Sequence, residues 1–186
     1  MSSEIILIGP VGSGKSTIGA LLAEELGIPL FDMDERRWAY YQEIGFSEEK
    51  QKEISQRDGI LGVYRYWKLF EIHAVERALA EHHDCVFDFG AGHSVYEDDA
   101  LFRRARTALA PFENVVLLLP SASLEESGRI LRQGKWDGMA GDFDLNGHFL
   151  KHHSNFDLAK HTAYTIGKTP EETRDEVLRM IKVTTR

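Results

Sequence analysis

The chain has 186 residues, of which 42% are hydrophobic and 28% charged, and this is enough apolar material for the core of one domain. Thirty acidic against twenty-two basic residues give a formal net charge of −8, which disfavours nucleic acid as the main partner. The apolar runs fall short of the roughly 20 residues that a membrane span needs, so no membrane partner is expected. The absence of a signal-like start and the single cysteine predict a cytoplasmic protein, either a monomer or a small homo-oligomer.

The chain opens with a short apolar run, a glycine-rich turn and an amphipathic stretch. Residues 4–9 (EIILIG) are mostly apolar and β-branched, which is typical of a strand buried on both faces of a parallel sheet. Residues 15–26 carry apolar side chains at helical spacing, and Gly27 stands where a helix-ending glycine is expected. The first 27 residues therefore predict a strand, a loop and a helix.

Short apolar runs continue to alternate with longer amphipathic stretches along the rest of the chain. Strands are expected at residues 30–31, 85–89, 115–119 and 163–166, and helices at residues 62–80, 98–109, 124–131 and 170–181. Such alternation indicates right-handed βαβ units. We therefore predict a single α/β domain over residues 1–186, with three layers formed by a five-stranded parallel sheet and helices on both of its faces.

Two segments do not follow this alternation. Residues 35–59 are charged and aromatic without a strand pattern, and residues 134–147 contain four glycines and three aspartates. In α/β enzymes such insertions are typical of substrate-binding or lid segments, and the alternative is that they are ordinary surface loops.

Residues 9–16 (GPVGSGKS) match the phosphate-binding pattern G-x-x-x-x-G-K-[ST] in full, between a predicted strand and a predicted helix. The glycines allow a tight turn whose N–H groups point inward, and the helix N-terminus adds partial positive charge. In this pattern Lys15 reaches the β- and γ-phosphates and Ser16 ligates Mg²⁺. We therefore predict ATP and Mg²⁺ as cofactors, bound by Gly12, Ser13, Gly14, Lys15, Ser16 and Thr17.

The sequence around this motif resembles that of shikimate kinases. The family has G-x-G-K-S-T, a helix ending in L-G and an F-x-D-x-D pattern, and this chain has GSGKST at 12–17, LG at 26–27 and FDMD at 31–34. Residues 90–92 (GAG) stand where the family has three glycines, and residues 167–172 (GKTPEE) resemble the loop before its last helix. The resemblance implies a P-loop NTPase fold and a phosphotransferase that moves the γ-phosphate of ATP to an alcohol group of a small metabolite.

The resemblance also implies roles for residues that follow the second and third strands. Asp34 would bind the acceptor hydroxyl and orient or deprotonate it, and Asp32 would hold Mg²⁺ through water. Asp88 ends an apolar strand and competes with Asp32 for the metal. The alternatives are capping carboxylates at a strand-end turn and, for Asp88, an inward polar strand residue. The turn after the third strand is expected to contact the acceptor through Gly90, Ala91 and Gly92.

Shikimate kinases hold the acceptor carboxylate with arginines, because a planar guanidinium grips it in a bidentate way. Lys68 stands at the first of these positions, and residues 151–155 (KHHSN) replace R-x-P-L-Y at the second. We expect Lys68 to bind the acceptor within a helical acceptor-binding region over residues 35–80. Arg36 and Arg37, which follow Asp34 directly, offer a replacement for the missing clamp. These departures leave the identity of the hydroxylated acceptor open.

A lid is expected over residues 134–150. By resemblance, Arg129 would pack near adenine, and Arg132 would reach the transferring phosphate and act in catalysis with Lys15 and Asp34. Lys135 is a second candidate for this contact, and the family's R-P-L-L lid sequence is absent. The alternative is that these basic residues are solvated helix surface.

Two of the eight histidines, His148 and His152, are spaced as helical metal ligands are, and His153 follows directly. No third ligand stands at a recognised spacing, so the sequence does not predict a zinc site.

The chain is therefore predicted to be an ATP-dependent small-molecule kinase. The alternative from a different class is a regulatory nucleotide-binding switch that lacks a small-molecule acceptor. A kinase acting on polynucleotide ends is disfavoured by the acidic net charge.

Overall fold

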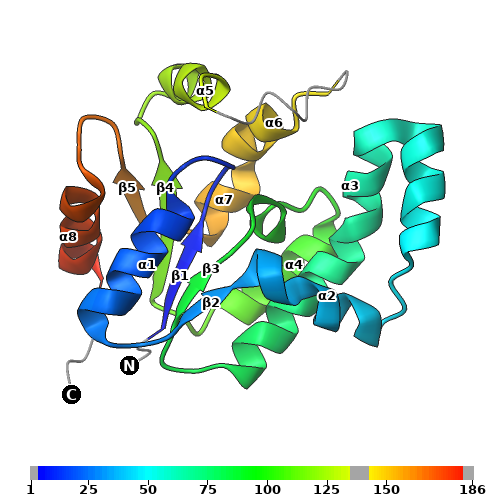
Figure 1. Ribbon diagram of the computed structural model, residues 1–186, viewed down its shortest axis with the longest axis horizontal. Helices are drawn as coiled ribbons and strands as arrows, with labels where there is room; N and C mark the ends of the chain where they lie inside the picture. Colours follow the sequence, from blue (N-terminus) through cyan, green and yellow to red (C-terminus); the bar gives the residue numbers. More distant parts are fainter. Residues whose placement is uncertain (1–3, 135–142, 182–186) are drawn as a thin grey trace.

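A five-stranded parallel sheet with strand order β2-β3-β1-β4-β5 forms the centre of the computed structural model, which describes residues 4–134 and 143–181 (Figure 1). The strands are β1 (Ile5–Ile8), β2 (Leu30–Asp32), β3 (Val86–Asp88), β4 (Asn114–Leu119) and β5 (His161–Tyr164). The helices are α1 (Lys15–Leu26), α2 (Met33–Glu43), α3 (Glu48–Glu81), the 3₁₀ helix η1 (Ala91–Ser94), α4 (Asp99–Leu109), α5 (Leu124–Arg132), α6 (Leu145–Lys151), α7 (His153–Leu158) and α8 (Pro170–Met180). The predicted α/β class and five-stranded parallel sheet are confirmed.

Alternate residues of the strands supply two separate cores, one on each face of the sheet. Ile5 and Leu7 pack with α1 and α8, whereas Ile6 and Ile8 pack with α2, α3, α4 and α7. Both sets of side chains are fully buried. Burial on both faces explains why the central strands are continuously apolar, and the result is the predicted three-layer arrangement (Figure 1).

The longest helix, α3, begins earlier than expected and folds back on itself. Gly59 has φ 62° and ψ −156°, a backbone conformation that is essentially restricted to glycine. The two parts of α3 lie side by side in Figure 1, and Trp67 Nε1 donates to Gln51 Oε1 across them at 2.8 Å. Residues 35–59 thus contain helix and no strand, and the kink directs the second part of α3 along the sheet.

The last strand, β5, lies two residues earlier than the sequence pattern predicts. It pairs with β4 from Val116↔His161 to Leu119↔Tyr164, so polar His161 and Thr162 belong to the strand. Ile166, which the pattern placed in the strand, is instead 47% exposed. The pattern fails here because β5 is an edge strand and its partly exposed residues need not be apolar.

All five strands are parallel, so their carboxyl ends lie at one edge of the sheet, where open α/β folds bind ligands. β1 leads into the glycine-rich loop, β2 ends at Asp32, and β3 ends at Asp88 just before the turn that contains Gly90. The topology therefore brings together the three segments that the sequence marked as functional. Within the described residues, none of the helices combines the length and apolarity that a membrane crossing requires.

Replacing Gly59 with alanine should destabilise the protein by about 1–3 kcal/mol, because alanine disfavours this backbone conformation. No atom lies within 4 Å of the added Cβ, so the effect comes from the backbone alone. Thermal unfolding followed by circular dichroism measures it, with Gln56→Ala, at an exposed position of the same helix, as the control. Equal melting temperatures for the two variants would contradict the need for glycine at position 59.

Candidate active site

The glycine-rich loop between β1 and α1 holds a buried lysine at its centre. Gly14 caps the N-terminus of α1 with φ 95°, which glycine adopts readily, and Lys15 opens the helix. Lys15 Nζ donates to the carbonyl oxygens of Gly9 and Pro10, each at 3.0 Å. The side chain thus lies folded along the loop, at the helix N-terminus where a phosphate group is favoured.

Two carboxylates face this lysine. Burial lowers the pKa of Lys15, while the charges of Asp88 and Asp34 act in the opposite direction. Burial likewise raises the pKa of Asp88, and the neighbouring Ser16 hydroxyl and Lys15 counteract that rise. For both groups burial is the larger effect, and the neighbouring opposite charges offset it only in part.

Asp88 has an unsatisfied oxygen that suits a metal ion. The residue is 5% exposed, and within the described part of the chain its Oδ1 is buried without a hydrogen-bond partner. The Ser16 hydroxyl lies beside the same carboxyl group. Oxygen ligands of this kind are those that Mg²⁺ prefers, so Ser16 and Asp88 fit the predicted metal.

Asp32 and Asp34 lie close in sequence but make different contacts. Asp32 Oδ1 accepts from the backbone N–H groups of Asp34 and Glu35 at 2.8 and 3.2 Å and so caps α2. The Asp34 side chain is 59% exposed and pairs with Arg37 at 2.9 Å. Asp32 thus makes the contacts expected of a capping carboxylate at a strand-end turn. The Asp34 carboxylate remains accessible.

A cavity of about 650 Å³ joins the phosphate loop to the predicted acceptor region. Among the sequence-predicted residues it is lined by Gly12, Gly14, Lys15, Ser16, Thr17, Asp34, Asp88, Ala91 and Gly92. Ser13, Asp32, Lys68, Gly90, Arg129 and Arg132 are not among its lining residues. Its other walls come from α3 and α6, chiefly from Tyr64, Trp67, Glu71 and Phe149.

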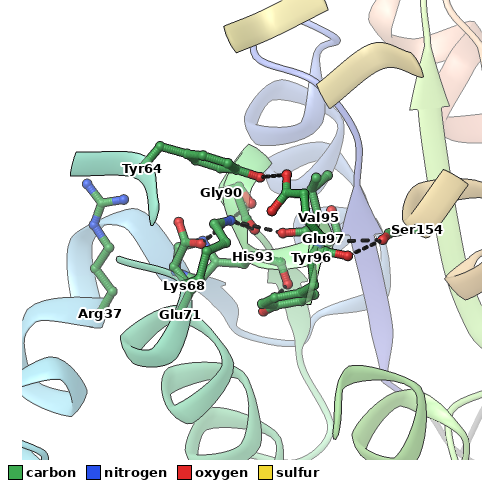
Figure 2. Close-up of polar contacts among 12 residues, drawn as sticks. Arg37, Tyr64, Lys68, Glu71, Gly90, His93, Val95, Tyr96, Glu97 and Ser154 are labelled. Carbon is green, nitrogen blue, oxygen red and sulfur yellow. Dashed lines mark hydrogen bonds and ion pairs between the residues drawn. The ribbon is translucent and has the colours of Figure 1, made fainter. Parts of the chain in front are cut away.

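The ammonium group of Lys68 is bound by partners inside the protein. Its Nζ donates to the carbonyl oxygens of Gly92 and Val95, each at 2.9 Å, and forms an ion pair with Glu71 (Figure 2). The ammonium also lies 4.1 Å from the centre of the Tyr64 ring. These partners use the three N–H donors of a lysine. Lys68 therefore holds α3 against the turn after β3, and its predicted contact with the acceptor stays a prediction.

Carboxylates pack directly against the backbone of the turn after β3 at its two glycines. A Cβ at Gly90 would collide with Oδ1 of Asp34, and a Cβ at Gly92 would collide with Oε1 of Glu71. Ala91 stands between them, 8% exposed, and lines the cavity. The GAG sequence thus places both carboxylates beside the turn and adds one methyl group to the cavity wall.

Arg37 is the cation that the acceptor side of the cavity presents. Besides Asp34, its guanidinium contacts the Trp38 and Trp67 rings, 4.7 and 5.1 Å from their centres. Its Nε is buried and lacks a hydrogen-bond partner within residues 4–134 and 143–181. Arg36 instead lies over the Phe31 ring, 5.1 Å from its centre, and does not line the cavity. Of the two arginines that the sequence offered, only Arg37 is in place to bind an acceptor.

Asn146 of α6 is a site residue that sequence reasoning missed. Its Oδ1 accepts from the backbone N–H of Val11 at 2.8 Å, and its Nδ2 donates to the Val11 carbonyl at 3.1 Å. The asparagine therefore pairs with both polar groups of one residue of the phosphate loop. No local motif marks it, because its partner lies 135 positions away in the chain.

The two lid arginines lie apart from the cavity. The Arg129 side chain is 65% exposed and its guanidinium lies 3.5 Å from the Glu126 carboxylate, on the same helix. Arg132 lines a small hollow between α5 and α6. Lys135 and the rest of residues 135–142, which form part of the predicted lid, fall outside the described residues. The roles of these basic residues stay predictions.

Comparison with known proteins identifies the family. Residues 11–131 match the family model of shikimate kinase. The shikimate kinase of Saccharopolyspora erythraea is 35% identical over 129 residues, which cover 69% of this chain and 62% of that enzyme. The chain thus matches less than two thirds of the length of that relative.

Solved structures agree in fold. A shikimate kinase from Acinetobacter baumannii, in complex with shikimate, superposes with a TM-score of 0.63 at 19% identity, covering 97% of this chain and 93% of the other. The shikimate kinase of Aquifex aeolicus gives a TM-score of 0.58 at 23% identity, covering 95% and 94%. With the family model matched over residues 11–131, the chain belongs to the shikimate kinase family.

Proposed function

We propose that this protein is a kinase that transfers the γ-phosphate of ATP to a hydroxyl group of a small metabolite. The observation that carries this proposal is the single cavity in which the phosphate loop, Asp34 and Arg37 meet. Phosphoryl transfer depends mainly on positioning and on charge neutralisation, and this cavity offers both. A regulatory switch without an acceptor would not need the cavity beside Asp34.

The donor side is formed by the phosphate loop. Its backbone N–H groups and Lys15 bind the phosphates and stabilise the charge that develops on the γ-phosphoryl group. Ser16 and Asp88 are the residues that would hold Mg²⁺, which neutralises phosphate oxygens when bound. Asp32 supports this side indirectly, because it caps the helix that carries Asp34.

The acceptor side is formed by Asp34 and Arg37. The Asp34 carboxylate orients the acceptor hydroxyl and takes its proton as the oxygen bonds to the γ-phosphorus. The bond between that phosphorus and the β,γ-bridging oxygen breaks, and ADP leaves. Arg37, stacked on tryptophan rings, holds an anionic group of the acceptor, since guanidinium binds a carboxylate in a bidentate way. A hydroxylated carboxylic acid of the shikimate class is the acceptor that this pair suits.

Replacing Asp34 with asparagine should lower acceptor-dependent turnover by about 10²–10⁴-fold, because a positioned general base contributes that much. ATP binding should be retained, since Asp34 contacts the acceptor side. The measurement is ADP release from Mg·ATP with and without shikimate, with Lys15→Ala as the inactive control. Full acceptor-dependent release of ADP by Asp34→Asn would refute the assignment of Asp34 as the base.

A wild-type protein that binds ATP but does not release ADP faster with shikimate or other hydroxy acids would favour the regulatory alternative.

Replacing Arg37 with alanine should raise the KM for the acceptor by about tenfold or more, the expected loss of a charged hydrogen bond. The KM for ATP should change little, because the contacts of Arg37 are with Asp34, Trp38 and Trp67. Arg36→Ala is the matched control, since it removes the same charge one position earlier and outside the cavity. Equal effects of the two substitutions on the acceptor KM would count against the proposed clamp.

Replacing Asn146 with alanine should weaken ATP binding by about tenfold, because two hydrogen bonds to the phosphate loop are lost. Asn146→Asp should bind ATP at least as weakly, because a carboxylate oxygen would then face the Val11 carbonyl oxygen and add a negative charge beside the phosphate loop. Titration with a fluorescent ATP analogue measures the affinity. Unchanged affinity in Asn146→Ala would show that the loop holds its shape without α6.

A further inference from the structure

A second cluster of functional side chains lies outside the main cavity, where α6 meets the segment before α4. Glu97, His148 and His152 place one potential ligand atom each within 4.8 Å of the others. His148 Nε2 lies 2.5 Å from Glu97 Oε1, and the His148 and His152 rings have centroids 5.1 Å apart. None of the three lines the cavity that contains Lys15.

The fold supplies the third group that the sequence pattern lacked. The two histidines are four residues apart at the end of α6, whereas Glu97 lies 51 positions before His148. Tyr64 of α3 donates its hydroxyl proton to Glu97 Oε1 at 2.6 Å and so orients the carboxylate (Figure 2). An outer partner that holds a carboxylate in position is a recurring feature of protein metal sites.

We infer that Glu97, His148 and His152 bind a divalent transition-metal ion of the Zn²⁺ class. Two imidazole nitrogens and one carboxylate oxygen form a donor set that Zn²⁺ accepts in protein sites, with a fourth position left for water. Imidazole ligands favour zinc, copper and nickel over Mg²⁺ and Ca²⁺, which take oxygen ligands. This ion is therefore distinct from the Mg²⁺ that would accompany ATP.

Metal binding replaces specific hydrogen bonds that the three groups now make. The contact between His148 Nε2 and Glu97 Oε1 must widen slightly to admit an ion. The backbone N–H of Ser154 donates to His152 Nδ1 at 3.2 Å. If Nδ1 ligates the metal, this hydrogen bond is replaced, and if Nε2 ligates it, Nδ1 carries the proton and no longer accepts. In both cases the Ser154 N–H loses its acceptor, which marks ligation by His152.

The bound ion would add a link between two elements that the contact between His148 and Glu97 already brings together. It would link the end of α6 to the segment before α4, and α6 also carries Asn146, which holds the phosphate loop. Metal binding would thus stabilise the carboxyl end of α6, while Asn146 in the first turn of α6 is hydrogen-bonded to Val11. The ligand atoms belong to none of the residues assigned to phosphate transfer, so binding and catalysis can be measured separately.

Isothermal titration of the full, tag-free and chelator-treated chain with Zn²⁺ tests this site. We expect one ion per chain, and at least about tenfold weaker binding in Glu97→Gln and in His152→Ala, each of which removes a ligand. His153→Ala is the matched control, because His153 is adjacent in sequence but pairs with Asp157 and is not part of the cluster. Glu97→Gln keeps the size of the side chain, and circular dichroism checks that each metal-free variant is folded.

Two spectroscopic measurements identify the ligands directly. Co²⁺ in place of Zn²⁺ should give the intense visible absorption of a four-coordinate site, and this absorption should be absent in His152→Ala. In the amide NMR spectrum, the Ser154 N–H should shift when Zn²⁺ is added. Absence of stoichiometric binding, binding that survives both ligand substitutions, or loss of binding in His153→Ala would overturn the proposed site.

Discussion

The buried ammonium group of Lys68 is the constraint on which the acceptor half of the site depends. A charge that is only 6% exposed must be matched by partners, and here two backbone carbonyls and the Glu71 carboxylate supply them. These contacts pull the turn after β3 against α3, which places Gly92 against Glu71. The position of Ala91 in the cavity wall follows from the same contacts.

In the proposed function, the internal contacts of Lys68 leave acceptor recognition to another element. Since its donors are used within the protein, the cavity needs a different cation for an anionic substrate. In the proposed function Arg37 meets this need, because α2 starts at the end of β2, where Asp32 caps it, and carries Asp34 on its first turn and Arg37 three residues later. The proposed general base and the proposed clamp are therefore positioned by one helix N-terminus, while the phosphate loop is positioned by another.

Helix α6 connects the separate parts of the molecule. Through Asn146 it pairs with the phosphate loop, through Phe149 it closes the cavity, and through His148 it meets Glu97. In Figure 1 it lies beyond the edge to which the strand arrows point, next to α5. A change in the position of α6 would therefore act on the nucleotide side and on the cavity wall together.

The sequence by itself determined the fold class and predicted the donor half of the proposed site, because both rest on local patterns. Apolar runs mark the buried strands, and the phosphate loop is one continuous segment whose glycines and lysine act in sequence order. Only the tertiary structure decided the acceptor half, since its groups come from distant segments. Which of Lys68 and Arg37 faces the cavity depends on how deeply each is buried and on which partners compete for it. Asn146 contacts a residue 135 positions away, and Glu97 contacts one 51 positions away. The bounds of the edge strand β5 were predicted two residues late, because an exposed edge relaxes the apolar pattern. The reversal at Gly59 was missed, because a glycine reversal within a helix is set by the packing of its two halves.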